Sequence, residues 1–236
     1  MNATPSIVSL ATILLVLSTA AHAETRSIDV PEFSSASFDS ALTVDVTAGA
    51  TQSLTIMASH AEDLDDIRYE VVGGELSVWS ERDFWDVLAQ RGGVVKVTIA
   101  TPSLKSLSAT GASHVIARGL EGDALSFEAS SASAIAIESV HARAIAVTAT
   151  SAGNVSIVGE CRAITAKIAG AASLDAHRLQ CVDADITAAS AGTAAVFASG
   201  AVKADVFSAG KLTLIGGPDH VDDEVDSGGQ VEVLDE

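Results

Sequence analysis

The chain has 236 residues, a net charge of −18 and 48% hydrophobic residues. This length suits one sizeable domain or two small ones. The acidic balance disfavours binding to nucleic acids and to anionic lipid surfaces, because both need basic patches on the protein.

Residues 1–23 have the pattern of a secretory signal peptide. An apolar run from Ile7 to Leu17 is followed by Ala21-His22-Ala23, a small-x-small motif of the kind that signal peptidase cleaves. The run is shorter than the roughly 20 residues of a membrane-spanning helix. We therefore expect a cleaved signal peptide, with a retained N-terminal anchor as the alternative. After cleavage no transmembrane segment is predicted in residues 24–236, and the mature protein is expected in the periplasm or at the cell surface.

Residues 24–100 are rich in predicted strands. Leu42, Val44 and Val46 alternate with polar residues, and Gly73-Gly74 separates two alternating runs, as in a β-hairpin with a two-residue turn. We expect this region to begin the stack of repeats that follows and to cap its end, because the end of a solenoid exposes its core.

The segment Trp79–Gly93, WSERDFWDVLAQRGG, interrupts two strands and contains both tryptophans of the chain. Two interpretations are open for Trp79, Phe84 and Trp85. They plug the N-terminal end of the stack as a cap, or they form a binding patch, because exposed aromatic side chains mark interfaces.

Residues 101–217 repeat with a period of about 20 residues, which is typical of a solenoid. Small residues recur at equivalent positions, namely Gly111, Ser131, Ser151, Gly170, Ser190 and Ser208. Apolar residues four and six positions after each of these alternate with more polar ones, which is the period of a strand with one buried face. The residues four positions after are Val115, Ile135, Val155, Leu174, Ala194 and Leu212.

This pattern predicts an all-β parallel β-helix in which each repeat is one rung and the small residues form tight corners. Twenty residues are too few for a pair of helices, and the leucine ladder of leucine-rich repeats is absent. We expect residues 24–236 to form a single domain. It comprises N-terminal strands and cap (24–100), repeats (101–217) and an acidic C-terminal segment (218–236).

Cys161 and Cys181 are the only cysteines and lie 20 residues, or one repeat, apart. Neighbouring rungs stack about 4.8 Å apart, within the ~4.4–6.8 Å Cα separation of a disulfide. Because an exported protein meets an oxidising compartment, we predict a disulfide between them. Two free thiols remain an alternative, as does a metal ladder with His141, for which no fourth ligand is evident.

Motifs for catalysis, cofactors or metals are not found. The chain contains no P-loop, GxSxG, HExxH or paired CxxC, so we expect no catalytic residue, cofactor or metal site. A polysaccharide-cleaving enzyme would need clustered carboxylates on one outer face. The outward aspartates of the repeats are instead predicted to be scattered, and Asp185 is expected to pair with Lys203 on the next rung.

Three segments in this order, DDIRYEVVGGELSV, VKVTIATPSLKSLSATGASHV and LIGGPDHVDDEVDSGGQV, resemble the head GIN domain family. With the small-residue corners, the resemblance covers residues 28–233. That family is labelled "putative auto-transporter adhesin" and is common in secreted or envelope proteins of bacteria. The resemblance implies a right-handed β-helix outside the cytoplasm and supplies no catalytic motif.

The sequence thus predicts a secreted or periplasmic, non-enzymatic β-helix module. It would bind an unidentified envelope or surface ligand, either protein or polysaccharide, or have a structural role in the envelope. The alternative function is a carbohydrate-active enzyme on the same scaffold.

Overall fold

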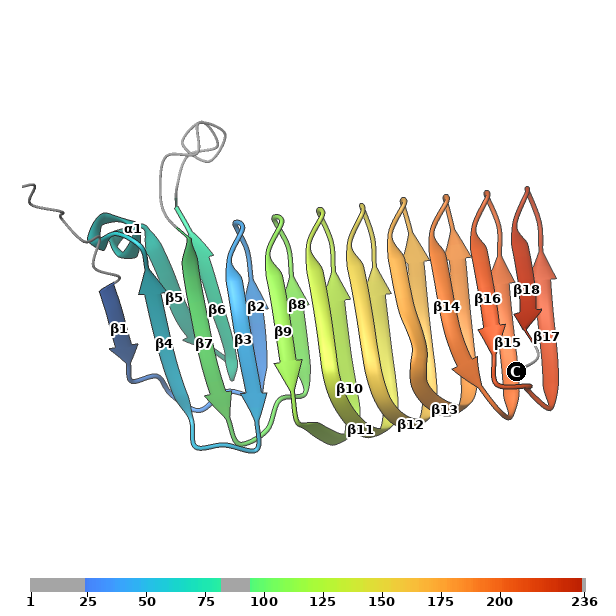
Figure 1. Cartoon of the computed structure of the whole chain (residues 1–236), viewed down its shortest axis with the longest axis horizontal. Coiled ribbons are helices and arrows are strands. Elements are labelled where there is room, and N and C mark those ends of the chain that lie inside the picture. Colours follow the sequence, from blue (N-terminus) through green and yellow to red (C-terminus); the bar gives the residue numbers. More distant parts are fainter. Residues whose placement is uncertain (1–23, 82–93, 235–236) are drawn as a thin grey trace, which may run out of the picture.

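The computed structural model describes residues 24–81 and 94–234, which form a parallel β-solenoid (Figure 1). The solenoid fold expected from the 20-residue period is confirmed. One short helix, α1 (Ala61–Asp65), lies at the N-terminal end. No helix of the described residues is long and apolar enough to cross a membrane.

Two groups of strands build the stack. The N-terminal strands are β1 (Glu24–Ile28), β2 (Ser35–Phe38), β3 (Thr43–Ala48), β4 (Ser53–Ala58), β5 (Ile67–Val72), β6 (Glu75–Ser80) and β7 (Val95–Thr101). The strands that follow are β8 (Ser106–Ala109), β9 (His114–Arg118), β10 (Leu120–Ala129), β11 (Ala134–Ala149), β12 (Asn154–Ala169), β13 (Ser173–Ala189), β14 (Thr193–Ala198), β15 (Ala201–Val206), β16 (Lys211–Ile215), β17 (His220–Val225) and β18 (Gln230–Leu234).

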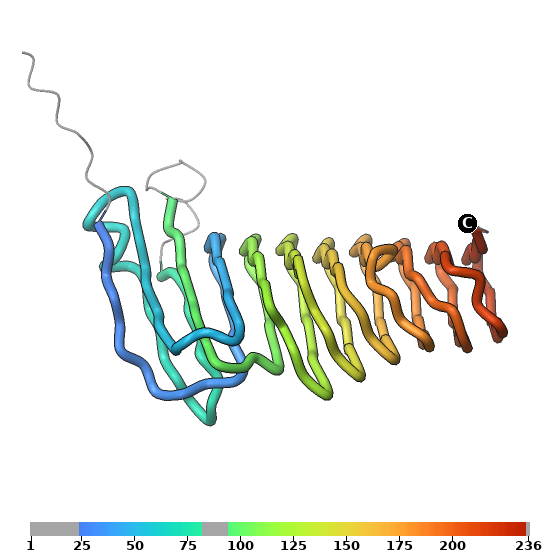
Figure 2. The backbone as a smooth tube through the Cα atoms, turned by 60° about the horizontal axis from the view of Figure 1, so that its bottom comes forward, coloured from blue at the N-terminus to red at the C-terminus, as the bar shows by residue number. Residues whose placement is uncertain are grey.

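Each rung of the repeats has two arms, joined by a tight corner at one edge and a gentler bend at the other (Figures 1 and 2). β11, β12 and β13 each run through the bend and supply both arms of a turn. Each pairs in parallel with the next, so that Val155 of β12 lies between Ile135 of β11 and Leu174 of β13. Residues at equivalent positions of successive repeats therefore form columns along the stack.

The columns that point inward form a narrow hydrophobic core. The six residues expected four positions after each corner marker are all buried, from Val115 at 0% exposed to Ala194 at 4%. Because alternate side chains of a strand point to opposite faces, the residues between them lie outside. Alanine is frequent in the core because the two arms lie close together.

Each corner is a β-turn with two residues in the left-handed region of backbone conformation. Ser131 (φ 55°) and Ala132 (φ 62°) form one such corner, closed by a hydrogen bond from the N–H of Ser133 to the carbonyl of Ser130. Positive φ at both central residues is the geometry of a type I′ turn. Small side chains are needed here because the corners stack directly on one another.

The order of rungs at the N-terminal end does not follow the order of the chain. β2 pairs in parallel with both β6 and β8, and β3 pairs in parallel with both β7 and β9. The rung made by residues 35–48 is therefore inserted between two rungs that come later in the sequence. Figure 1 shows β2 and β3 between the β6/β7 and β8/β9 rungs.

Antiparallel strands and α1 complete the N-terminal end. β4 pairs with β7 and β1 pairs with β4, both antiparallel, while β5 and β6 form the hairpin predicted at Gly73-Gly74. Leu64 of α1 is 2% exposed and joins the hydrophobic core at this end.

The acidic C-terminal segment forms the last rung rather than a separate tail. β17 pairs with β15 and β18 pairs with β16, both in parallel. In this rung Asp223 stands in register with the buried Ala204, on the side of the strand that faces inward in earlier rungs.

Candidate functional site

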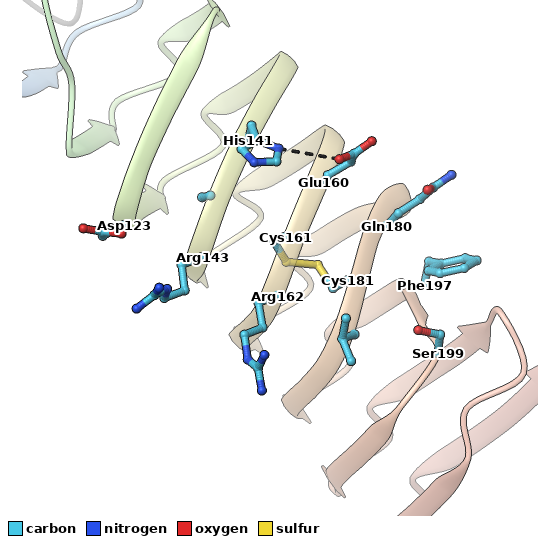
Figure 3. A pocket seen from close by; sticks show the side chains of 12 residues that line it. Asp123, His141, Arg143, Glu160, Cys161, Arg162, Gln180, Cys181, Phe197 and Ser199 are labelled. Carbon is cyan, nitrogen blue, oxygen red and sulfur yellow. Dashed lines mark ion pairs between the residues drawn. A yellow bond between two sulfur atoms is a disulfide. The ribbon is translucent and has the colours of Figure 1, made fainter.

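A shallow groove of about 830 Å³ runs along the bends, on the edge of the solenoid opposite the corners. It crosses the rungs of β10, β11, β12 and β13 and ends at the bend between β14 and β15 (Figure 3). The groove is lined by Asp123, His141, Ala142, Arg143, Glu160, Cys161, Arg162, Gln180, Cys181, Val182, Phe197 and Ser199.

Ala142, Cys161 and Cys181 form a buried column along the groove. They are in register on successive rungs, and each is less than 9% exposed. A disulfide joins Cys161 to Cys181, whose Cα atoms are 4.5 Å apart (Figure 3). It ties β12 to β13 directly beneath the polar side chains of the groove.

His141, Glu160 and Gln180 form one polar column beside the cysteines. They are also in register on successive rungs. His141 Nδ1 lies 3.5 Å from a carboxylate oxygen of Glu160. The next polar side chain, Gln180, offers both a donor and an acceptor to a ligand.

Asp123, Arg143, Arg162 and Val182 form the other column. Arg143 and Arg162 fall between the register pairs Ala142–Cys161 and Ala144–Ala163, so the two arginines are neighbours on adjacent rungs. Figure 3 shows both side chains extending the same way, away from the disulfide. Asp123 occupies the equivalent position one rung before Arg143.

The two groove arginines lack acidic partners. In residues 24–81 and 94–234, neither Arg143 nor Arg162 makes an ion pair or a side-chain hydrogen bond. Arg118 is different: its side chain bonds Glu138 at 2.5 Å and lies 3.9 Å from Asp45. The pKa of Arg118 is raised by the hydrogen bond to Glu138, and further by the charges of Glu138 and Asp45.

Differences in bend length close the far end of the groove. Ala176 is in register with Val196 and Cys181 with Ala198, so four residues of β13 face a single residue of β14. The longer bend of β13 leaves a step at which Phe197 and Ser199 lie. The ring of Phe197 covers Gly216, where an added Cβ would come within 2.6 Å of it.

A second irregularity shapes the groove near its middle. The register of β11 and β12 shifts between Ile137 and Val140, where Gly159 has a φ of 148°. A Cβ at Gly159 would lie 2.0 Å from the carbonyl oxygen of Val140, so only glycine fits. This shift sets Ala142, and not His141, beside Cys161, so the His141–Cys161–Cys181 ladder considered from the spacing is wrong.

The predicted aromatic patch is described only at Trp79, because Phe84 and Trp85 lie outside the described residues. Trp79 is partly exposed on the outer face of β6, while its neighbours Val78 and Ser80 are buried. It lines a depression of about 310 Å³ with residues of β2 and β8, among them Ser37 and Ser108.

The predicted ion pair between Asp185 and Lys203 is corrected in part. The two residues are in register on β13 and β15. The Lys203 ammonium, however, lies 3.4 Å from Asp205, two residues along its own strand. The hydrogen bond to Asp205 raises the pKa of Lys203, with smaller contributions from the charges of Asp205 and Asp185. All three side chains are exposed or partly exposed, so this pairing adds little stability.

The sequence prediction missed the arginine pair. The signal was available, since Arg143 and Arg162 lie 19 residues apart, close to one repeat. Their adjacency depends on the one-residue shift near Gly159, which the period alone does not locate.

Comparison with known proteins places these features in a family. A family model described as "Putative auto-transporter adhesin, head GIN domain" matches residues 32–218. No curated protein matches the chain.

Three crystal structures have a similar fold. A "putative adhesin" from Bacteroides fragilis has a TM-score of 0.78 at 19% identity, covering 92% of this chain and 98% of its own. A "putative lipid binding protein" from Parabacteroides distasonis has a TM-score of 0.67 at 17% identity, covering 90% and 96%. A "putative adhesin" from Parabacteroides merdae has a TM-score of 0.65 at 15% identity, with the same coverages.

Proposed function

The chain belongs to the head GIN domain family, and from that membership we propose that it is an exported, non-enzymatic module that binds a ligand of the cell envelope or surface. The bend-side groove is the proposed binding site. A polysaccharide suits this site better than a protein, because the groove is long, shallow and lined by polar columns.

One observation carries the proposal: the groove places hydrogen-bonding and charged side chains in columns on several successive rungs. A polymer lying along the stack would meet polar or charged side chains on several successive rungs. The strands hold these side chains in fixed positions, and the disulfide ties two of the rungs together. Such preorganisation reduces the entropy lost on binding.

The proposed location outside the cytoplasm is supported by the disulfide. Disulfides persist in oxidising compartments such as the periplasm and the cell exterior. The expected signal peptide, residues 1–23, points to the same route and to removal of that segment during export.

The disposition of the groove carboxylates supports binding over glycoside hydrolysis. Hydrolysis by a pair of carboxylates requires that the two flank one glycosidic bond. Asp123 and Glu160 stand in different columns on rungs of β10 and β12, with β11 between them, and Glu160 is paired with His141.

A retention experiment tests the proposal. The exported protein would be passed over immobilised envelope polysaccharides and surface-protein fractions, and sugar release would be followed by a reducing-end assay. We expect retention without sugar release. Retention on none of the materials would overturn the binding function, and sugar release would establish the enzymatic alternative.

A pair of variants tests the site. Gln180→Trp places a large side chain in the groove and should abolish retention. Thr165→Trp places the same side chain on the exposed outer face of β12, outside the groove, and should leave retention unchanged. Equal retention by both variants would show that the ligand binds elsewhere.

A further inference from the structure

Arg143 and Arg162 bring two positive charges together where the structure gives them no partner. Their Cα atoms are on adjacent rungs, about 4.8 Å apart. Because the two side chains extend the same way from neighbouring strands, their charges lie on the same face and repel each other, and an ion pair with an acid would relieve the repulsion. In the part of the chain that the structure describes, that relief is absent.

Among the other arginines that the structure describes, Arg26, Arg68 and Arg118 each form an ion pair with an aspartate or glutamate. Arg178 forms none but stands alone. Arg143 and Arg162 differ because two arginines without an acidic partner lie on adjacent rungs. The acids of the groove do not form ion pairs with Arg143 or Arg162. Glu160 pairs with His141, and Asp123 stands beyond Arg143 at one end of the column.

Arginine is suited to one class of ligand group. Its planar guanidinium donates two parallel hydrogen bonds to a carboxylate or a phosphate, and such charge-assisted bonds are stronger than neutral ones. Two exposed guanidiniums on neighbouring rungs can donate to one anionic group from both sides, or to anionic groups that follow each other along a polymer.

The other residues that line the groove favour a sugar polymer as the molecule that carries the carboxylate or phosphate. Gln180 and Ser199 supply hydrogen-bonding groups, and Phe197 supplies a partly exposed ring at the end of the groove. The acidic chain as a whole repels an anionic membrane, whereas a single strand of polymer can enter the groove without bringing a charged surface near the other acids.

The geometry points to an acidic polysaccharide as the ligand, with its carboxylates held by Arg143 and Arg162. This inference rests on the proposed function, since it names the class of ligand for the same groove. The disulfide lies between the column that holds the two arginines and Val182 and the column formed by His141, Glu160 and Gln180.

The test measures binding of the exported protein to polygalacturonate and to its fully methyl-esterified form. Esterification removes the negative charges while keeping the sugar backbone. We expect the acid form to bind and the ester to bind at least about tenfold more weakly, because charge-assisted hydrogen bonds are lost. Binding to the acid form should also weaken as salt is raised.

Variants link the binding to the two arginines. Arg143→Gln with Arg162→Gln should weaken binding of polygalacturonate by about tenfold or more. A matched control, Arg178→Gln with Lys211→Gln, removes the same two charges at exposed positions outside the groove and should bind as the unmodified protein does. Circular dichroism and thermal melting would check that both double variants are folded.

Three results would overturn the inference. The first is equal binding of the acid and the ester, the second is equal binding by the two double variants, and the third is binding only to phosphatidylglycerol vesicles. The proposed function would survive the first two, because the protein would still bind a polymer. Failure to bind any polysaccharide, protein fraction or vesicle would overturn both.

Discussion

The N–H of Ala132 donates a hydrogen bond of 3.1 Å to the carbonyl oxygen of Ser151 in the corner of the next rung. The same bond joins Ala112 to Ser131, Ala152 to Gly170 and Ala191 to Ser208. The corners are thus linked to one another along the edge of the stack. This explains why Ser, Ala and Gly recur there: the backbone must be left-handed, and larger side chains would separate the corners.

We expect Ala132→Val to lower the free energy of unfolding by about 2 kcal/mol, because a β-branched residue is strained at positive φ. Ala134→Val is the matched control, since Ala134 lies two residues on, partly exposed in the extended arm of the same rung. Valine suits a strand, so the control should be neutral or slightly stabilising. Urea denaturation of both variants would measure the difference, and equal stabilities would contradict the corner geometry.

Ile157→Asp should lower stability by about 3 kcal/mol or more, because it places a carboxylate without a partner in the core. Ile157 is 1% exposed and is in register with the buried Ile137. Ala136→Asp makes a comparable change on the outer face of β11 and should have a much smaller effect. Thermal melting would compare them. An unchanged melting temperature for Ile157→Asp would mean that the register is wrong.

Protein purified without reductant should contain no free thiol, because Cys161 and Cys181 are joined. Alkylation followed by mass spectrometry would show it, and two alkylated cysteines in freshly exported protein would exclude the disulfide.

Replacing both cysteines by serine should lower stability by about 3 kcal/mol in the chain-entropy account of a loop of about 20 residues. Reductant should destabilise the unmodified protein and have no effect on the serine variant.

Asp123→Asn should strengthen binding of polygalacturonate about two- to fivefold, the effect of one exposed charge near the ligand. Asp123 precedes Arg143 in the same column and repels an anionic polymer there. Asp185→Asn removes one negative charge outside the groove and is the control. Titration calorimetry at low salt would detect the change, and weaker binding by Asp123→Asn would show that Asp123 helps to hold the ligand.

The inward positions of the repeats could be predicted from the sequence, because apolar and polar residues alternate with a period of two. This alternation specifies which side chains face the core. Val155 and Ile157 are examples, both buried as expected. The insertion of β2 and β3 could not be predicted, since alternation at Leu42, Val44 and Val46 indicates a strand without indicating its neighbours. Strand pairing is decided by contacts between distant segments, such as Val44 with Val97 and with Val115.

The candidate groove was harder to predict than the core for a related reason. Its shape depends on where each bend gains or loses residues. β11 has one residue more than β12 at the shift near Gly159, and β13 has three more than β14 between Ala176 and Cys181. Because of the one-residue shift, a fixed period brings His141 to Cys161 and misses Arg143 beside Arg162. Exposed bends tolerate inserted residues, so such shifts cost little stability. For the same reason they are difficult to locate from the sequence.

The insertion of residues 35–48 between later rungs has a consequence for folding kinetics. β2 and β3 are synthesised early, yet their neighbours on one side, β8 and β9, end at residue 118. Until then both strands keep open edges, and the loops that must close are long, which slows folding. From β11 onward each new rung adds to a finished one, so growth can proceed by nearest-neighbour steps. We therefore expect the slow phase of refolding to belong to the N-terminal half, where β2 and β3 pair with segments far along the chain.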